Sequence, residues 1–207
     1  LLTIVFASSL FVVVSCKDVG DNPMPPPPIG FITRDAEPAW SPDGETIAFV
    51  HGDTVPGLTG IYLIDTNRTN NHLLYPSTAA HSPAWSPDGQ WLVFANRGQI
   101  FKMRMTGDSL VQLTTEGNNY FPDWSFRGDW IAYDSDSGEE GNVIWKMHAD
   151  GGGKRDISIH GVGEWRAPNW SPDTKRIVHE RYVDAGTTEI VIMDSTGGNA
   201  VRLTFDE

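Results

Sequence analysis

Side chains that can bind or react recur at one point of this sequence, just ahead of regularly spaced tryptophans. His81, Tyr120 and Arg166 each stand four residues before a tryptophan, and Glu37 stands three residues before another. An imidazole, a phenol, a guanidinium and a carboxylate together provide hydrogen bonds, charge of both signs and flat apolar surface. If the tryptophans are equivalent in the fold, we expect these four side chains to converge on a ligand or partner. The alternative is that they are solvated loop residues or plug a closed channel.

The sequence lacks the signatures of several familiar catalytic sites. It has no Gly-x-Ser-x-Gly nucleophile elbow, and His179-Glu180 is not followed by the second histidine of a zinc protease. The single cysteine, Cys16, cannot form a paired-thiolate zinc site. The loop from Asp134 to Asn142 is rich in the oxygen ligands that Ca²⁺ prefers, but it lacks the fifth-position ligand and the distal glutamate of an EF-hand. We therefore expect a solvated acidic loop and no cofactor, with Ca²⁺ as the alternative.

The tryptophans belong to an internal repeat with a period of roughly 40–45 residues. They are Trp40, Trp85, Trp124 and Trp170, separated by 45, 39 and 46 residues. An aliphatic residue follows each tryptophan by seven positions, and a further strand-like run begins at Ile61, Ile100, Ile144 and Ile190. Fourteen residues later each copy ends at Tyr75, Thr114, Ser158 or Thr204. Each copy therefore predicts four strands, A to D, in the length expected of one propeller blade.

A tight turn is predicted between strands A and B of each copy. In the first two copies Trp-Ser-Pro-Asp-Gly supplies a proline with preset φ and a glycine, Gly44 or Gly89, suited to positive φ. The third copy keeps only Gly128, and the fourth has Thr174 where glycine is expected. A β-branched residue is unfavourable at positive φ, so the fourth turn is predicted to be strained or rearranged.

Loop lengths indicate which end of the strands carries function. The A–B and C–D connections do not vary between copies, whereas the B–C and D–A connections do. Loops that vary on a constant scaffold usually carry binding residues. We therefore place the binding face at the B–C and D–A loops, which comprise residues 51–60, 76–81, 116–120, 135–142, 161–166 and 181–188.

The repeat resembles that of the TolB-like β-propellers. The resemblance rests on Trp-Ser-Pro-Asp-Gly, followed by Ile-Ala-Phe, an Ile-Tyr-x-x-Asp strand and Leu-Thr, and it extends over residues 29–207. It implies an all-β fold, a propeller of four-stranded blades with four blades present. It also implies that strand A lines a central channel and that the tryptophans are core residues of the blades.

The N-terminal segment predicts a membrane anchor. Residues 1–15 form an uncharged apolar run of signal-peptide length that ends in Val13-Val14-Ser15-Cys16, which resembles a bacterial lipobox. Residues 16–28 are polar and proline-rich and predict a stiff tether ahead of the propeller, residues 29–207. We expect lipidated Cys16 to hold the protein at the bacterial cell envelope, periplasmic or surface-exposed. An ordinary signal peptide or a buried strand is the alternative.

The repeat also predicts that the propeller has more blades than four. The segment Ile29–Thr33 matches the D-strand ending at Thr204, but the four copies already contain their own D strands. A leading D strand would complete a blade whose other strands lie beyond residue 207. We therefore expect a fragment of a six- or seven-bladed propeller that is monomeric when complete.

Three functions fit this organisation. A net charge of −12 argues against nucleic acid, because phosphates demand a basic surface. We favour an envelope scaffold that binds a protein or a small ligand without catalysing a reaction. The alternatives are the propeller domain of a secreted hydrolase, prolyl-oligopeptidase-like or tricorn-like, and a metal-assisted lyase of acidic sugars.

Overall fold

The computed structural model describes residues 33–136, 141–158, 164–184 and 187–204. The lipobox-like run that ends at Cys16, the proline-rich segment expected to be a tether, and all but Thr33 of the leading D-like segment lie outside the described residues. The chain divides into two units, Leu1–Phe31 and Ile32–Glu207, and the described residues all belong to the second. No helix in the described ranges is long and apolar enough to cross a membrane.

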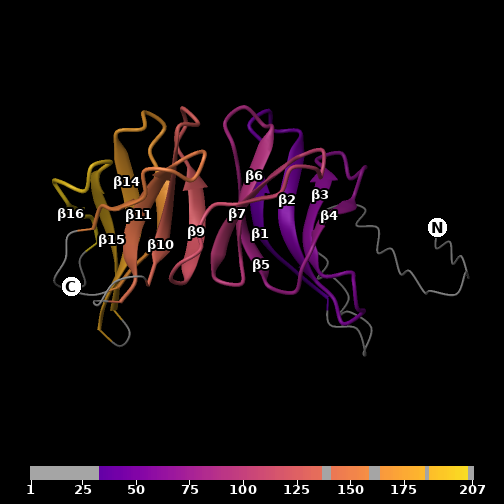
Figure 1. Ribbon diagram of the computed structural model, residues 1–207, viewed down its shortest axis with the longest axis horizontal. Coiled ribbons are helices and arrows are strands. Elements are labelled where there is room, and N and C mark those ends of the chain that lie inside the picture. The colour runs from indigo at the N-terminus through magenta and orange to yellow at the C-terminus, as the bar shows by residue number, and fades with distance from the viewer. Residues whose placement is uncertain (1–32, 137–140, 159–163, 185–186, 205–207) are drawn as a thin grey trace, which may run out of the picture. The chain divides into compact units, whose positions relative to one another are not determined.

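The described residues form four antiparallel four-stranded sheets, each with its strands in sequence order (Figure 1). In the first sheet the strands are β1 (Arg34–Trp40), β2 (Thr46–Gly52), β3 (Gly60–Asp65) and β4 (His72–Pro76), and in the second β5 (Ala80–Trp85), β6 (Trp91–Asn96), β7 (Gln99–Arg104) and β8 (Val111–Gln112). The third contains β9 (Asn119–Trp124), β10 (Trp130–Ser135), β11 (Val143–His148) and β12 (Arg155–Asp156), and the fourth β13 (Glu164–Trp170), β14 (Arg176–Asp184), β15 (Thr187–Asp194) and β16 (Val201–Arg202). The predicted A–B–C–D order is confirmed in all four copies.

The register is the same in every sheet. The repeat tryptophan always pairs with the aliphatic residue seven positions later, as in Trp40 with Ile47 and Trp124 with Ile131. Strands β1, β5, β9 and β13 contact one another in succession, so the first strand of each sheet lies on the inner side. Apolar clusters fill the space between successive sheets, such as Val93 and Ala95 of β6 against Ile131 and Tyr133 of β10.

Two residue types that recur in the repeat, the glycine of the A–B turn and the hydroxyl residue at the end of each copy, have clear structural roles. Gly44, Gly89 and Gly128 have positive φ in the A–B turns, and Thr174 is held at +60° in the fourth turn, so the predicted strain is present. At the other end of the repeat a hydroxyl caps strand C. Thr114 accepts a hydrogen bond from the backbone N–H of Ile100 at 2.8 Å, and Thr204 does the same for Ile190 at 2.9 Å.

The repeat tryptophans are not equally buried. Trp124 and Trp170 are 6% exposed, as expected for core residues, whereas Trp85 is half-buried and Trp40 is 63% exposed. The prediction that all four are core residues is therefore wrong for Trp40. Trp124 shares a cluster with Val93 of the second sheet, and Trp170 shares one with Ala132 of the third, so each buried tryptophan packs with the sheet that precedes it in the chain.

Candidate functional site

A bulge at the same place in every first strand directs the candidate binding residues. The residue three positions before each tryptophan has positive φ: 54° at Glu37, 53° at Ser82, 48° at Phe121 and 49° at Ala167. The ladder between first and second strand shifts register at that point in all four sheets. Such bulges commonly re-aim a side chain at the rim of a sheet. Here they set the direction of the residue before the bulge, which is His81, Tyr120 or Arg166 in the last three sheets.

Two of the predicted site residues meet across neighbouring sheets. The rings of His81 and Tyr120 are stacked with centroids 5.6 Å apart, and Phe121 meets His81 edge-on at 6.2 Å. Burial lowers the pKa of His81, and the nearby Glu37 carboxylate partly opposes this effect. At neutral pH the imidazole is therefore uncharged, and it can both donate and accept a hydrogen bond.

Glu37 lies close to His81, and it has a partner within the fold. Its carboxylate accepts a hydrogen bond from the backbone N–H of Ser82, which links the first sheet to the second. The hydroxyl of Ser82 is 3.1 Å from Nδ1 of His81. Glu37 therefore contributes negative charge and also fixes the bulge that carries His81.

Arg166 lies in the fourth sheet and is held on two sides. Its guanidinium donates to the carboxylate of Glu164 at 2.5 Å and lies over the ring of Tyr182, 4.9 Å from the centroid. The described contacts join Arg166 to neither His81 nor Tyr120. The sequence pattern did not single out Glu164 or Tyr182, because neither occupies a fixed position relative to a tryptophan.

A buried carboxylate, that of Asp134, neighbours both Tyr120 and Arg166. Asp134 of β10 pairs in register with Tyr120 of β9, is fully buried, and has no hydrogen-bond partner for Oδ1 among the described residues. Asn142 donates to its other oxygen at 3.3 Å. Burial raises the pKa of Asp134 to about 7, while the Arg166 guanidinium acts in the opposite direction. Asp134 was expected only as part of an acidic loop, and it is instead enclosed between the third and fourth sheets.

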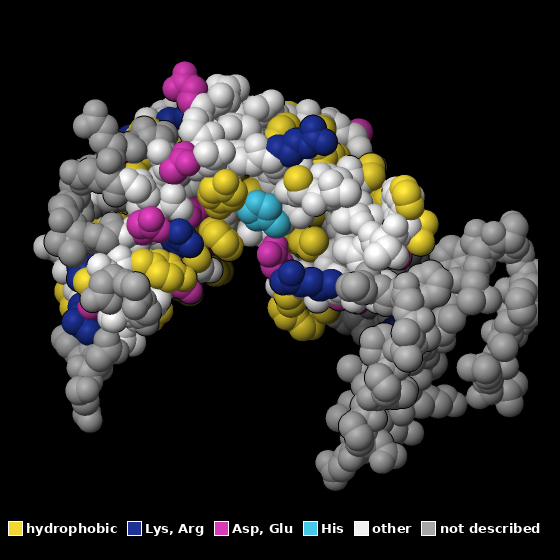
Figure 2. All heavy atoms as spheres, turned by 90° about the horizontal axis from the view of Figure 1, so that it is seen from below, with side chains coloured by type: hydrophobic (Ala, Val, Ile, Leu, Met, Phe, Trp, Pro, Cys, Tyr) yellow, Lys and Arg dark blue, Asp and Glu magenta, His cyan; other side chains and the backbone are white. Residues whose placement is uncertain are grey.

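Figure 2 views the end of the sheets at which these residues lie. A histidine sits among hydrophobic side chains at the hollowed inner edge, with acidic and basic side chains on either side. In the described ranges no group of three or more His, Cys, Asp or Glu side chains is placed to hold a metal ion. Residues 137–140 of the acidic loop lie outside the described residues.

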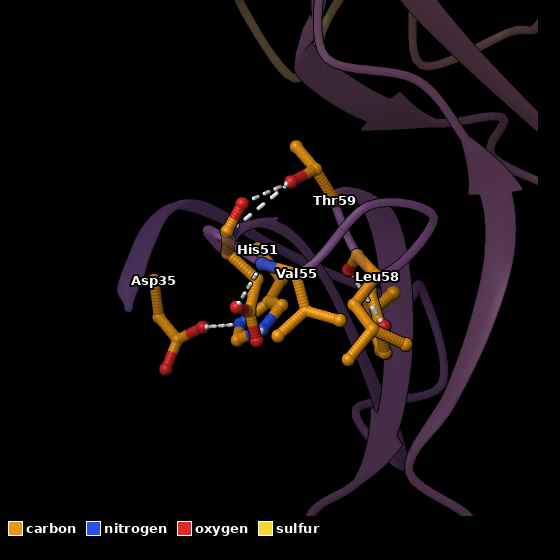
Figure 3. A network of polar contacts seen from close by, with 7 residues as sticks. Asp35, His51, Val55, Leu58 and Thr59 are labelled. Atoms are coloured by element: carbon orange, nitrogen blue, oxygen red, sulfur yellow. Dashed lines mark hydrogen bonds and ion pairs between the residues drawn. The ribbon is translucent and has the colours of Figure 1, made fainter. Parts of the chain in front are cut away.

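A second polar network fastens the first B–C loop at the same end (Figure 3). Nδ1 of His51 is 2.6 Å from the carboxylate of Asp35, and Nε2 is 3.6 Å from that of Asp53. Asp53 in turn accepts from the backbone N–H of Val55 at 2.8 Å, and its own N–H donates to Thr59 at 3.0 Å. His51 therefore joins the edge of β1 to the loop, and the sequence pattern gave no sign of this network.

Comparison with known proteins agrees with the topology. The family model of the TolB beta propeller domain matches residues 31–164. An uncharacterised protein of Agrobacterium fabrum, Atu1656, is 29% identical in an alignment 181 residues long that covers 80% of this chain and 59% of that protein.

Two solved structures share the fold. The crystal structure of TolB from Acinetobacter baumannii superimposes with a TM-score of 0.72 at 22% identity, covering 83% of this chain and 44% of that one. A putative TolB from Agrobacterium tumefaciens superimposes with a TM-score of 0.68 at 21% identity, covering 82% and 80%. The chain thus spans less than two thirds of Atu1656 and of the Acinetobacter protein. With the family model matching more than half of its length and the four-stranded sheets in the corresponding order, the chain belongs to the TolB beta propeller domain family.

Proposed function

We propose that this propeller is a binding scaffold of the bacterial cell envelope, which recognises an envelope protein or a small ligand at His81, Tyr120, Arg166 and Glu37. The repeated bulge carries this proposal, because it follows His81, Tyr120 and Arg166 directly at the same point of three successive sheets. Bulges re-orient side chains, and strained backbone conformations occur most often at functional sites.

The chemistry of this surface suits a polar ligand with a flat portion. The His81–Tyr120 stack and Phe121 provide aromatic area. Glu37 and Arg166 provide opposite charges on either side of it. Rigid aromatic and arginine side chains are the residue types that most often dominate binding energy at interfaces.

Photo-crosslinking of the full-length protein in cells tests the site. We expect p-benzoylphenylalanine in place of Tyr120 to give discrete adducts, detected by gel shift and intact mass. The same group in place of Phe126 serves as the control, because Phe126 is 56% exposed in an A–B turn at the opposite end of the sheets. Adding His81→Ala and Arg166→Ala should reduce the Tyr120 adduct about tenfold, the effect of losing roughly 1.4 kcal/mol of binding. Equal adduct yields at positions 120 and 126 would contradict the assignment.

Membrane attachment through Cys16 is a separate part of the proposal. It rests on the lipobox-like run Val13-Val14-Ser15-Cys16 and the proline-rich segment that follows. A lipidated protein expressed from its complete gene should sediment with membranes, whereas Cys16→Ser should not, since the acyl chains supply the membrane affinity. Val14→Ala, which keeps the cysteine, is the control. If wild type and Cys16→Ser partition alike, Cys16 is not the anchor.

A further inference from the structure

A pocket lies between the first and second sheets at the end opposite to the site above. It has a volume of about 530 Å³, within the range of small-ligand sites. It is lined by the A–B and C–D turns of the first sheet and by side chains of the second, with Leu63, Trp85 and Met105 apolar and Asp43, Asp65 and Asn70 polar.

The same space is filled by lysine at the next two interfaces. Lys102 of the second sheet donates from Nζ to the carbonyl of Ala149 in the third, at 2.6 Å, and lies 4.7 Å over the ring of Trp91. Lys146 of the third sheet donates to the carbonyl of Ser195 in the fourth and lies 4.5 Å over the ring of Trp130. Each ammonium therefore joins one sheet to the C–D turn of the next.

The first sheet departs from this pattern at both positions. Leu63 occupies the place of Lys102 and Lys146, since all three pair with the middle residue of the second strand: Ala48, Val93 or Ala132. Thr46 occupies the place of Trp91 and Trp130. Thr46 and Leu63 both line the pocket. Threonine is smaller than the tryptophan found at the next two interfaces, and leucine lacks the lysine ammonium, so the space stays open.

The acceptor for the missing ammonium is still present. Met105 is the counterpart of Ala149 and Ser195, because each of the three donates its N–H to the equivalent turn carbonyl, at 2.8–3.0 Å. In the described part of the chain no hydrogen bond reaches the carbonyl of Met105. Trp85, whose counterpart Trp170 lies beneath Lys146 at 5.9 Å, is half-buried and faces this pocket.

The charge of the lining favours a cation. The Ser41 hydroxyl lowers the pKa of Asp43, so that carboxylate is ionised at neutral pH. Asp65 adds a second carboxylate, and the lining contains no lysine or arginine. The chain as a whole carries a net charge of −12, which attracts cationic groups.

We propose that this pocket binds an alkylammonium group, a lysine side chain of a partner protein, in the position that Lys102 and Lys146 occupy at the following interfaces. The aliphatic stem lies against Leu63 and Trp85. The ammonium donates to the carbonyl of Met105 within reach of the Asp43 and Asp65 carboxylates. This surface is distinct from the one around Tyr120, and the two can be disabled independently.

Nuclear magnetic resonance titration of the full-length protein with Nα-acetyl-lysine N-methylamide tests the proposal. The reporter is the indole N–H of Trp85, which donates to the carbonyl of Ala39 at 3.0 Å. We expect a saturable shift of this signal with the lysine probe, and binding at least tenfold weaker for the norleucine analogue, which has the stem without the ammonium. No saturable shift, or equal affinity for the two probes, would overturn the proposal. A shift with saccharides alone would likewise overturn it and would identify a sugar site.

Two variants separate binding from folding. Thr46→Trp with Leu63→Lys rebuilds the arrangement of the other interfaces, so it should lose probe binding and raise the unfolding midpoint. Leu63→Met keeps an apolar residue of similar size and should bind the probe within about twofold of wild type. Undiminished binding by the double variant would refute the assignment, and a folded Leu63→Met variant without binding would do so as well.

Discussion

Replacing Trp124 with alanine is expected to lower the free energy of unfolding by about 3–5 kcal/mol, the usual cost of truncating a buried tryptophan. Trp124 is 6% exposed and packs in the cluster that contains Val93, Ile131 and Met147 between the second and third sheets. Its indole Nε1 is buried and finds no hydrogen-bond partner in the described part of the chain, so we expect the loss to come from packing and apolar area. Denaturant titration of the full-length protein, followed by circular dichroism, measures the effect.

The matched control is Phe126→Ala, two residues further along the chain. Phe126 is 56% exposed in the A–B turn, so its removal should change the free energy of unfolding by no more than about 0.5 kcal/mol. A loss at position 126 comparable to that at position 124 would mean that the repeat tryptophan does not form the core between sheets.

The strand order and register were predictable because they depend on local sequence. A fixed seven-residue step from tryptophan to aliphatic residue sets the A–B pairing through a tight turn, and it produces the same pairs in all four sheets. Even the strain at Thr174 followed from the loss of glycine at one turn position.

Burial of the tryptophans was less predictable, because it depends on the neighbouring sheet. Trp40 and Trp124 occupy the same place in the repeat and pair with the same kind of residue, yet they differ tenfold in exposure. Nothing within a single copy of the repeat distinguishes them. The exposure of each tryptophan therefore depends on whether another sheet packs against it, and not on the residues of its own repeat.

The location of the candidate site in the fold was predictable from the sequence, whereas the contacts that its side chains make were not. The spacing placed His81, Tyr120 and Glu37 at one end of adjacent strands, where the structure brings them together. It did not reveal the bulge, nor that Arg166 would pair with Glu164 and lie over the ring of Tyr182. The ligand role of these residues stays a prediction.

The pocket at the opposite end did leave a signal in the sequence. Leu63 and Thr46 replace the lysine and tryptophan of the next two copies at aligned positions. The signal could be interpreted only after the structure showed that this face of strands B and C meets the next sheet.

The second large effect concerns pH and comes from Asp134. Burial raises the pKa of Asp134 from 3.8 to about 7 in the folded protein. Below pH 4 the carboxyl is protonated in both states. As pH rises from 4 to 7 it ionises in the unfolded chain and stays protonated in the folded one, so the folded state becomes progressively less stable. One pKa unit corresponds to about 1.4 kcal/mol, and the whole window is worth on the order of 4 kcal/mol.

Asp134→Asn should remove this pH dependence. The amide has the same shape, carries no charge at any pH and can still accept the hydrogen bond from Asn142. Between pH 5 and pH 8 the wild type should lose about 2–3 kcal/mol more stability than the variant. Asp123, whose pKa burial raises to about 6, is present in both proteins and cancels in the difference.

The control for this experiment is Asp173→Asn, in the exposed A–B turn of the fourth sheet. The Ser171 hydroxyl lowers the pKa of Asp173, so its carboxylate is ionised in the folded and unfolded states throughout this pH range. The substitution should therefore shift stability equally at pH 5 and pH 8. Denaturant titrations at half-unit pH intervals give all three profiles. Parallel profiles for wild type and Asp134→Asn would mean that Asp134 is solvated in the native protein, and the enclosure of this carboxyl between the third and fourth sheets would be wrong.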